Sequence, residues 1–353
     1  MNSFPKLTIG IPTYNRAGIL PETIDSIAAQ IDDNMRDNLE ILISDNASTD
    51  YTEQVIQSIT EQYPDLITYR RNKTNIGFSA NVDSVVRHAK NPFVLIMSDD
   101  DSLYPGALLS LLTNLQDHPN VGAIFLSHHG WDKQLKKPCS EFKPSPNIYD
   151  ETGTNYISRH KCFTPALISG IVVNRNLWLE NNPEYYFDIN SIHLIMAPLI
   201  IAKSSCLTLT DRPYVKYRND MGHWSIETDP TYPFPLIASY LKGCRAIKQV
   251  YPSKLHKLLY CSTMRTATGH AIRNKVLWLP FPRKQIVALL QPLFEKIDFI
   301  TWIYTFAFSV VSWLPRWTLY PFFVLLFLKN CKKATLNHYH LLLNPNPSAR
   351  AIK

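Results

Sequence analysis

The chain has 353 residues, of which 45% are hydrophobic, 12% aromatic and 18% charged. This composition is typical of a globular protein with a substantial core, and it excludes a disordered chain. A formal net charge of +7 favours a polyanionic partner, such as a phosphorylated substrate or acidic lipid head groups. Because no compact block of Lys and Arg and no zinc-finger or RNA-module signature is present, we expect no nucleic acid partner.

The cysteines and the first residues bear on the compartment. Six cysteines are scattered without a C-x-x-C pair, which favours a reducing cytoplasm over a disulfide framework or a metal cluster. The opening MNSFPKLTIGIPTYNR has no apolar region after a basic segment, so we expect no export signal.

From Leu7 to about Leu126, short β-branched runs alternate with segments of helical periodicity. These runs predict strands over residues 7–12, 39–44, 66–71, 92–98 and 121–127. Strands separated by helices of this length form βαβ units, so an α/β fold with a mostly parallel sheet is expected. Sheets of this kind bind ligands beyond the carboxyl ends of their strands.

Three polar clusters, TYNR, SDNASTD and SDDD, each follow a predicted strand. Asp and Asn are good turn formers, so one such cluster would be an ordinary loop. Three clusters at one sheet edge favour a binding site instead.

The SDDD cluster contains the consecutive carboxylates Asp99, Asp100 and Asp101. Adjacent carboxylates repel one another at neutral pH, so a bound cation would stabilise them. Oxygen donors without a nearby Cys select a hard ion, Mg²⁺ or Mn²⁺, that keeps positions open for phosphate oxygens. A solvated acidic loop is the alternative interpretation.

Beyond Ser127 the alternating pattern stops, and a polar segment with Pro and Lys indicates an ordered insertion or flap up to Pro165. His128 and His129 begin this segment, and without a spaced partner they are interpreted as surface residues. An apolar strand leading into a helix is then predicted over residues 166–178, followed by a helix and a strand over 191–209.

After about Pro235 the composition changes. Residues 283–298 have amphipathic helical spacing, and two apolar pieces, 299–315 and 317–328, follow. Each piece is at or below the roughly 17 to 25 residues that a membrane-spanning helix needs. We therefore expect an interfacial or shallow hairpin attachment, with Trp302, Trp313 and Trp317 at the membrane boundary. A buried helical hairpin or a dimer interface is the alternative.

Four segments carry a family resemblance: IGIPTYNR, LEILISDNASTD, NIGFSANVDSVVRHA and FVLIMSDDD. In this order and at these distances they resemble the nucleotide-sugar-binding half of a family 2 glycosyltransferase with the GT-A fold. The likeness covers residues 7 to about 125 and continues more weakly to about Trp224. It implies an α/β, GT-A fold with a mixed, mostly parallel sheet, to which this chain adds an α-helical C-terminal membrane-associating region.

The resemblance also implies which residues hold the nucleoside-diphosphate sugar. They lie in four places: the end of the first strand and its loop, the end of the second strand, the loop and helix that close over the nucleotide, and the acidic cluster. In that order the residues are Pro12, Thr13, Tyr14 and Arg16; Asp45; Asn75, Gly77 and Asn81; and Asp99.

The family's Asp-x-Asp metal motif corresponds to SDDD in one of two registers. In the first register, Asp99 and Asp101 are the two aspartates of the motif. In the second register, Ser98 replaces the first aspartate, and Asp100 and Asp101 are the residues that would bind the metal. We expect Asp100 and Asp101 to contact the Mg²⁺ or Mn²⁺, with Asp99 reaching the ribose or a metal-bound water.

The implied chemistry is inverting sugar transfer to a hydroxyl, with a base that removes the acceptor's proton. The family commonly supplies that base from a Glu-Asp pair, and this sequence departs from the pattern with YFDINSIH. Asp188 and His193 are therefore the candidate bases, and the ordinary histidine pKa of about 6.5 slightly favours His193. Otherwise Asp188 is a helix cap and His193 a packed helix residue.

The segment YRNDMGHWSIE supplies further candidates. Arg218 or His223 could contact the diphosphate, and Trp224 could stack on a sugar face. A turn whose Trp fills the edge of a core explains the same residues equally well.

The sequence thus predicts a metal-dependent glycosyltransferase at the cytoplasmic face of a bacterial inner membrane. Its acceptor would be a lipid-linked glycan, and the resemblance extends to enzymes that build O-antigen and other cell-surface polysaccharides. A catalytic domain is expected over residues 1–235, divided into a nucleotide-sugar half (1–126) and an acceptor half (127–235). A helical region over 236–353 carries the apolar segments 299–328.

Two other functions stay open at this point. A nucleotidyltransferase would share the α/β sheet and acidic ligands, although it should have a Gly-rich basic loop after the first strand, where PTYNRAG stands. A non-catalytic, membrane-bound subunit that binds sugar or nucleotide would explain the missing acidic pair.

Overall fold

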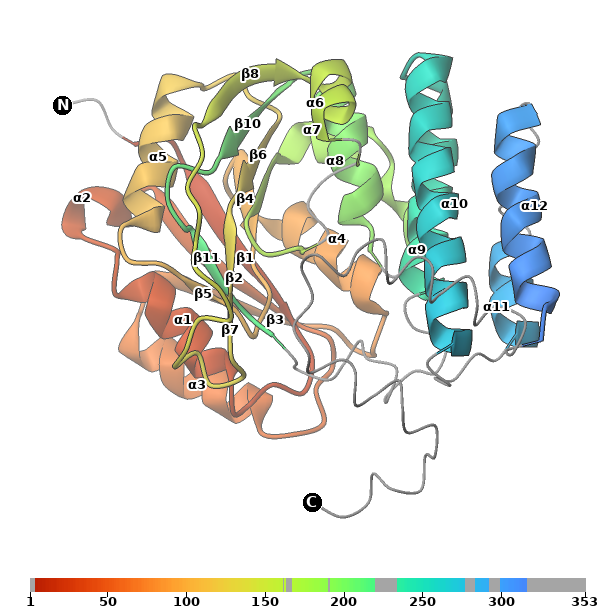
Figure 1. Cartoon of the computed structure of the whole chain (residues 1–353). Coiled ribbons are helices and arrows are strands. Elements are labelled where there is room, and N and C mark those ends of the chain that lie inside the picture. The colour runs from red at the N-terminus through yellow and green to blue at the C-terminus, as the bar shows by residue number, and fades with distance from the viewer. Residues whose placement is uncertain are drawn as a thin grey trace. The chain divides into compact units, whose positions relative to one another are not determined.

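A computed structural model of the chain describes residues 4–160, 162, 167–189, 191–219, 234–276, 283–291 and 299–315. The chain divides into two compact units (Figure 1). The first, here called the N-terminal unit, contains Met1–Met221 and Gly243–His256, and the second, the C-terminal unit, contains Gly222–Lys242 and Lys257–Lys353. The domain limits predicted from the sequence, 1–235 and 236–353, stay a prediction.

The N-terminal unit is built on an eight-stranded sheet with the order β3-β2-β1-β4-β9-β6-β10-β8. The pairs β3–β2, β2–β1 and β1–β4 are parallel, as is the pair β6–β10, whereas β9 and β8 are antiparallel to their neighbours. The mixed, mostly parallel α/β fold expected from the sequence is therefore confirmed. The strands are β1 (Leu7–Thr13), β2 (Leu39–Asp45), β3 (Ile67–Arg71), β4 (Phe93–Ile96), β6 (Ala123–Leu126), β8 (Ile148–Thr152), β9 (Ile171–Asn174) and β10 (Ser205–Leu209).

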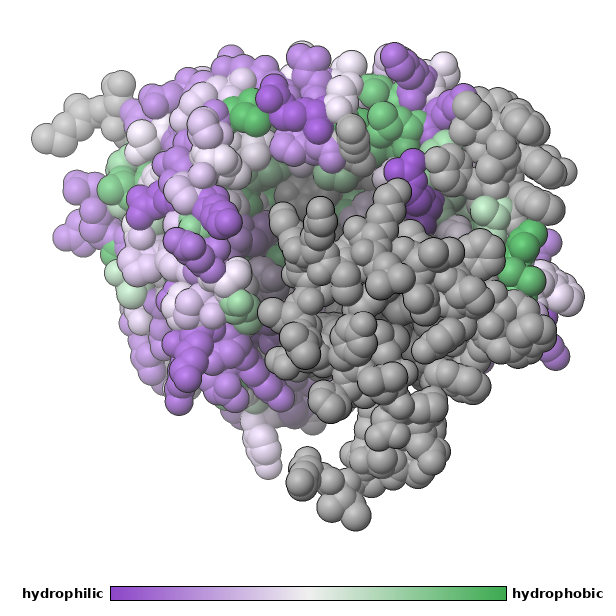
Figure 2. Space-filling view, in the orientation of Figure 1, coloured by the Kyte–Doolittle hydropathy of each residue, from purple (hydrophilic) through white to green (hydrophobic). Residues whose placement is uncertain are grey.

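Helices cover both faces of this sheet, with α1, α3 and α5 on one side and α4, α7 and α8 on the other (Figure 1). Figure 2 shows hydrophilic residues over much of the side formed by α1, α3 and α5. The helices of the unit are α1 (Leu20–Ala28), α2 (Asp33–Arg36), α3 (Thr52–Gln62), α4 (Phe78–His88), α5 (Ala107–Asp117), α6 (Gly153–His160), α7 (Arg175–Glu180) and α8 (His193–Ala202), with short 3₁₀ turns at Pro183–Tyr186 and Ile247–Gln249.

The central strands are apolar on both faces because helices cover both. Every residue of β1 and β2 is buried, as expected for strands in the middle of such a sheet. Ile9 and Ile11 belong to the core shared with α1, α3 and α5. On the opposite face, a Cβ at Gly10 would lie 1.9 Å from Cγ1 of Val85 in α4, so the glycine lets α4 approach the sheet closely.

A second, three-stranded sheet lies beside the acidic cluster. Its order is β5-β11-β7, with β5 at Ser102–Leu103, β7 at His128–Trp131 and β11 at Val215–Arg218. The predicted insertion is thus ordered in its described part, where it supplies β7, β8 and α6. His128 and His129 both lie in β7 and are half-buried, so their interpretation as surface residues was wrong.

The remaining helices are α9 (Phe234–Ala246), α10 (Ser253–Val276), α11 (Arg283–Leu290) and α12 (Phe299–Trp313). Within the C-terminal unit, the rings of Phe234 and Phe308 lie 6.3 Å apart and the hydroxyls of Tyr260 and Thr305 are 3.1 Å apart. Among the described residues, no helix has both the length and the apolar character needed to cross a membrane. The apolar segment 317–328 lies outside the described residues.

Candidate active site

The loops that follow β1, β2 and β4 leave the sheet at one edge. Thr13 at the end of β1 pairs in register with Asp45 at the end of β2. On the other side of β1, the backbone N–H of Met97 donates to the carbonyl oxygen of Gly10 at 2.9 Å, one residue before the acidic cluster. The structure therefore brings the three polar clusters of the sequence together, as parallel strands require.

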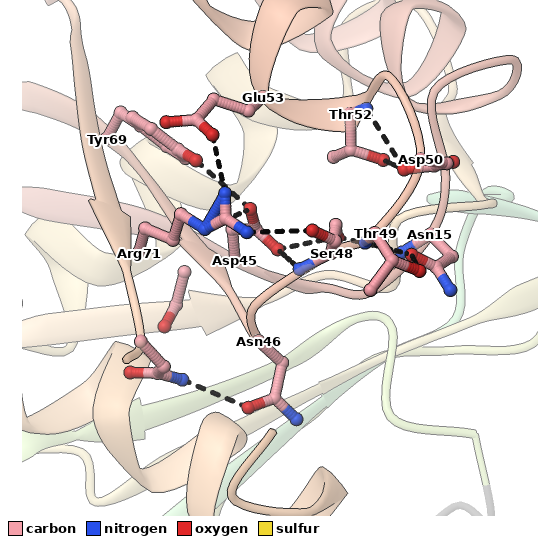
Figure 3. A network of polar contacts seen from close by, with 12 residues as sticks. Asn15, Asp45, Asn46, Ser48, Thr49, Asp50, Thr52, Glu53, Tyr69 and Arg71 are labelled. Carbon is pink, nitrogen blue, oxygen red and sulfur yellow. Dashed lines mark hydrogen bonds and ion pairs between the residues drawn. The ribbon is translucent and has the colours of Figure 1, made fainter. Parts of the chain in front are cut away.

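Asp45 is fully buried at the centre of a polar network (Figure 3). Its Oδ1 accepts hydrogen bonds from the backbone N–H of Ser48 at 2.8 Å and from the Ser48 hydroxyl at 2.6 Å. Its Oδ2 accepts from the hydroxyl of Tyr69 at 3.0 Å and lies 3.8 Å from Nε of Arg71. The carboxylate thus holds the β2 loop and β3 in place, and a direct contact with a nucleotide would require some of these bonds to be replaced.

A set of amides fixes the loop that precedes α4. The Asn46 side chain donates to Oδ1 of Asn75 at 2.9 Å, and that same oxygen accepts from the backbone N–H of Gly77, also at 2.9 Å. Gly77 has a φ of 86° at the N-cap of α4. Asn81, which is buried, accepts from the hydroxyl of Ser44 at 2.7 Å and donates back to its carbonyl oxygen at 2.9 Å.

The loop after β1 is pinned against the loop after β2. Asn15, at a φ of 55°, donates its backbone N–H to the hydroxyl of Ser48 at 2.9 Å and accepts from the backbone N–H of Thr49 at 2.8 Å. Tyr14 beside it is 42% exposed, which leaves its ring available to a ligand. Thr13 and its hydroxyl are buried, facing Asp99.

Two residues of the acidic cluster, Asp99 and Asp100, form ion pairs with Arg16. Asp99 is 7% exposed, and its Oδ1 lies 3.2 Å from Nε of Arg16. Oδ2 of Asp100 lies 3.3 Å from Nη2 of the same guanidinium, and Oδ1 of Asp100 accepts from the hydroxyl of Ser98 at 2.5 Å. Arg16, which the resemblance placed against the nucleotide sugar, is thus engaged with the acidic residues.

Asp101 is held by residues far along the chain. Its Oδ2 accepts from the hydroxyl of Ser169 at 2.5 Å, and its Oδ1 accepts from the backbone N–H of Arg218 at 3.0 Å. The carbonyl oxygen of Ser169 in turn contacts Nε2 of His128, and because a carbonyl only accepts, that nitrogen carries the proton. Burial lowers the pKa of His128, so its neutral form is favoured.

The environment of the cluster disfavours three charged carboxylates. Burial raises the pKa of Asp99 to about 6, while the charge of Arg16 opposes the shift. Burial and the neighbouring charge of Asp100 raise the pKa of Asp101 as well. Carboxylates in such a position are stabilised by a nearby cation, which is the chemistry that favours a hard divalent metal.

The three side chains do not form a ready metal cage. Within the described part of the chain, no group of three or more His, Cys, Asp and Glu residues is arranged to hold a metal ion. Both oxygens of Asp100 and of Asp101 accept one hydrogen bond each from protein donors. Since a carboxylate oxygen has two lone-pair directions, the donor set still fits a hard cation once the Arg16 guanidinium leaves Asp100.

Arg218 closes the site from β11. Its Nε donates to the carbonyl oxygen of Asp100 at 2.6 Å, its Nη1 donates to the carbonyl oxygen of Lys133 at 2.8 Å, and its Nη2 pairs with Glu22. The side chain is 4% exposed. A contact of this guanidinium with a diphosphate would require it to give up these bonds, so the diphosphate role of Arg218 stays a prediction.

The two candidate bases differ in exposure. His193 is the first residue of α8 and only 2% exposed, whereas Asp188 is exposed in the preceding loop. That loop is fastened to the start of α4, because the hydroxyl of Ser79 donates to the carbonyl oxygen of Ile189. Both candidates therefore belong to a segment anchored next to the Asn75–Gly77 loop. His223 and Trp224 lie outside the described residues.

Sequence reasoning missed the residues that support the carboxylates, above all Ser169, His128 and Tyr69. None of them belongs to a recognisable motif. For two of them the available signal was a position near a strand's start, since Ser169 precedes β9 and His128 begins β7, whereas Tyr69 lies in the middle of β3 and gave no such signal.

A known protein family matches the part of the chain that contains most of these residues. Residues 8–169 match the family described as "Glycosyl transferase family 2". The chain therefore contains a family 2 glycosyltransferase domain, and the resemblance inferred from the four segments is confirmed.

Two curated relatives are named as glycosyltransferases. The chain is 40% identical over 176 residues, 48% of its length, to "Abequosyltransferase RfbV" of Salmonella typhimurium. It is 37% identical over 109 residues, 31% of its length, to "GalNAc(5)-diNAcBac-PP-undecaprenol beta-1,3-glucosyltransferase" of Campylobacter jejuni. These matches span 52% and 34% of the relatives' own lengths, about half or less.

Two solved structures share the fold at low identity. Residues 1–349 of TarS from S. aureus in complex with UDP-GlcNAc superpose with a TM-score of 0.67 at 14% identity, covering 90% of each chain. The mannosyltransferase PcManGT from Pyrobaculum calidifontis, in complex with GDP-Man and Mn²⁺, gives 0.54 at 18% identity, covering 97% of this chain and 84% of its own.

Proposed function

We propose that this protein is an inverting, metal-dependent glycosyltransferase. It would move a sugar from a nucleoside-diphosphate sugar to a lipid-linked glycan in bacterial O-antigen or cell-surface polysaccharide synthesis. The observation that carries the proposal is the convergence of the β1, β2 and β4 loops, with Asp99, Asp100 and Asp101 at one edge of a family 2 domain.

The residues would divide the work of binding the donor. Tyr14, with its exposed ring, would lie against the base, and the Asn75–Gly77 loop would cover the nucleotide. Asp100 and Asp101 would hold Mg²⁺ or Mn²⁺, and Asp99 would reach the ribose or a metal-bound water. A bound divalent ion supplies positive charge to the departing diphosphate.

A base completes the reaction. His193 or Asp188 would take the proton from the acceptor hydroxyl as that hydroxyl attacks the anomeric carbon opposite the departing diphosphate. A single displacement from the far side inverts the configuration of that carbon.

The acceptor follows from charge and from the relatives' names. A polyprenyl diphosphate is anionic and membrane-bound, which suits a net charge of +7 and an apolar α12 whose Trp313 is 71% exposed. The name of the C. jejuni relative includes a PP-undecaprenol acceptor. Such an enzyme would work at the cytoplasmic face of the inner membrane, as a peripheral or monotopic protein.

Calorimetry of nucleotide binding tests the proposal. UDP, GDP, CDP and dTDP are titrated into the full chain with Mn²⁺ and then with a chelator, and the titrations are repeated on Asp100→Ala/Asp101→Ala. Glu61→Gln, an exposed acidic position of α3, is the matched control. We expect one nucleotide to bind only with metal, and the double variant alone to lose this binding. If no nucleotide binds under any condition, the transferase proposal is wrong and a non-catalytic role takes its place.

A further inference from the structure

Arg16 places one guanidinium against two neighbouring carboxylates. Its Nε lies 3.2 Å from Oδ1 of Asp99, and its Nη2 lies 3.3 Å from Oδ2 of Asp100. The side chains of Arg16, Asp99 and Asp100 are 15%, 9% and 15% exposed. A divalent cation held by this loop would also draw oxygens from adjacent carboxylates, so the guanidinium and the metal compete for the same ligands.

The Arg16 contacts are looser than those of the other arginine at the site. Charge-assisted N–H···O bonds usually measure about 2.7 to 2.9 Å, and both Arg16 distances are longer. Arg218 donates at 2.6 and 2.8 Å to backbone carbonyls and is 4% exposed. The contacts of Arg16 with the two carboxylates should therefore cost less to break than the contacts of Arg218 with the backbone.

Only the side chain of Arg16 needs to move for such an exchange. Its backbone N–H donates to the hydroxyl of Thr52 at 2.9 Å, and its carbonyl oxygen accepts from the backbone N–H groups of Ile19 and Leu20 at 3.1 and 3.0 Å. The loop stays fixed while the long, flexible side chain changes rotamer. A guanidinium released in this way carries a fork of donors that suits a diphosphate.

We infer that Arg16 is an exchangeable internal counter-ion of the acidic loop. Without a donor it neutralises Asp99 and Asp100, and when metal and nucleoside diphosphate bind together it leaves the carboxylates to the metal and pairs with the diphosphate. This inference rests on the proposed function, because it assumes a divalent cation at the acidic loop. It predicts that metal alone binds weakly and that nucleotide and metal promote each other's binding.

The test is Mn²⁺ binding to the metal-free full chain, measured by calorimetry and by electron paramagnetic resonance of free Mn²⁺, without nucleotide. Arg16→Gln removes the competing cation, so we expect about tenfold tighter Mn²⁺ binding. Arg16→Lys keeps the charge, but one ammonium does not span both carboxylates, and its affinity should fall between wild type and Arg16→Gln. Arg87→Gln is the control, since Arg87 pairs with Asp83 and Glu184 outside the acidic loop.

The same variants are then titrated with the nucleotide that wild type prefers, at saturating Mn²⁺. Arg16→Gln should bind it about tenfold more weakly, because the diphosphate loses its guanidinium partner. Thermal unfolding in the absence of ligand shows that each variant is folded.

The outcomes separate this inference from the proposed function. Tighter Mn²⁺ binding together with weaker nucleotide binding in Arg16→Gln supports the exchange. Equal or weaker Mn²⁺ binding, in a wild type that does bind metal and nucleotide, overturns the exchange and leaves the transferase intact. If Arg16→Lys binds Mn²⁺ with the same affinity as wild type, the net charge of the side chain explains the effect. That result also overturns the exchange. If wild type binds neither metal nor nucleotide, the proposed function fails and the inference fails with it.

Discussion

Nε of Arg218 lies 2.6 Å from the backbone carbonyl oxygen of Asp100 and donates a hydrogen bond to it. The same guanidinium reaches the carbonyl of Lys133 in the insertion and the carboxylate of Glu22 in α1. One buried cation thus joins the acidic loop, the insertion and the first helix.

Removing this cation should destabilise the fold. We expect Arg218→Ala to lower the free energy of unfolding by about 1 to 3 kcal/mol, because the part-buried carbonyl of Asp100 would lose its donor and the more exposed bonds to Lys133 and Glu22 would also be lost. Arg218→Lys should recover part of that loss. The control is Arg212→Ala, since Arg212 is exposed and donates one bond, to the carbonyl of Pro105 at 3.2 Å, and it should cost about 0.5 kcal/mol or less. Equal losses in urea unfolding of the two alanine variants would contradict the role given to Arg218.

The hydroxyl of Tyr69 donates to the buried carboxylate of Asp45 at 3.0 Å. Burial, followed by the charge of Asp45, raises the pKa of Tyr69 above its ordinary value of 10.0. Above pH 10 the unfolded chain therefore releases this proton while the folded chain keeps it. Because the unfolded state then binds fewer protons, stability falls as the pH rises.

Tyr69→Phe measures this effect. At pH 8 the variant should be less stable by about 1 kcal/mol, since it lacks the hydrogen bond to Asp45. Above pH 10 that gap should narrow as the pH rises, because only wild type loses stability when the unfolded chain releases the Tyr69 proton. Ser48→Ala removes a different bond to Asp45 and no titrating group, so its gap should stay constant. A Tyr69→Phe gap that is unchanged up to pH 11, in denaturant titrations at each pH, would refute the linkage.

Gly77 should be sensitive to substitution for backbone reasons alone. A Cβ there meets no atom within 4 Å, but the φ of 86° is one that L residues rarely adopt. Gly77→Ala should cost about 1 to 3 kcal/mol. Gly18 also has open space and no positive φ, so Gly18→Ala should be close to neutral. The comparison fails if thermal unfolding shows equal losses.

The two candidate bases are separated by kinetics. Substituting the true base, by His193→Gln or Asp188→Asn, should lower kcat by about 10² to 10⁴ with nucleotide affinity unchanged. His193 is 2% exposed, so nucleotide binding also checks that its variant is folded. Full kcat in both variants would remove both residues from the proton transfer.

Membrane association is tested by vesicle sedimentation. Trp313 is 71% exposed, and the guanidinium carbon of Arg283 lies 3.3 Å from the centre of its ring. We expect the full chain to sediment with vesicles that contain anionic phospholipid more than with zwitterionic ones, and Trp313→Ala to weaken this binding several-fold. Tyr185→Ala, which removes a 75% exposed aromatic ring of the N-terminal unit, should bind as wild type does. Equal partitioning of all three proteins would contradict the attachment.

Much of the fold was predictable because its signals are local. The five strands that the main sheet takes from residues 7–126 were located within two residues of each end, since most of them are buried strands that read as continuous apolar runs. The two-residue strand β5 was not predicted. His128 was predicted to be a surface residue because the polar segment that it begins has no alternating pattern of apolar residues. Its strand, β7, pairs with β11, which lies far along the chain.

The sequence by itself determined that Thr13, Asp45 and the acidic residues would meet at one edge, because parallel strands separated by helices direct their carboxyl ends the same way. Tertiary structure alone decided what each carboxylate contacts. The Arg218 backbone N–H that bonds Asp101 lies 117 positions along the chain, and the Ser169 hydroxyl lies 68 positions away. No local pattern encodes such pairs, since their geometry exists only after β9 and β11 have packed beside the acidic loop.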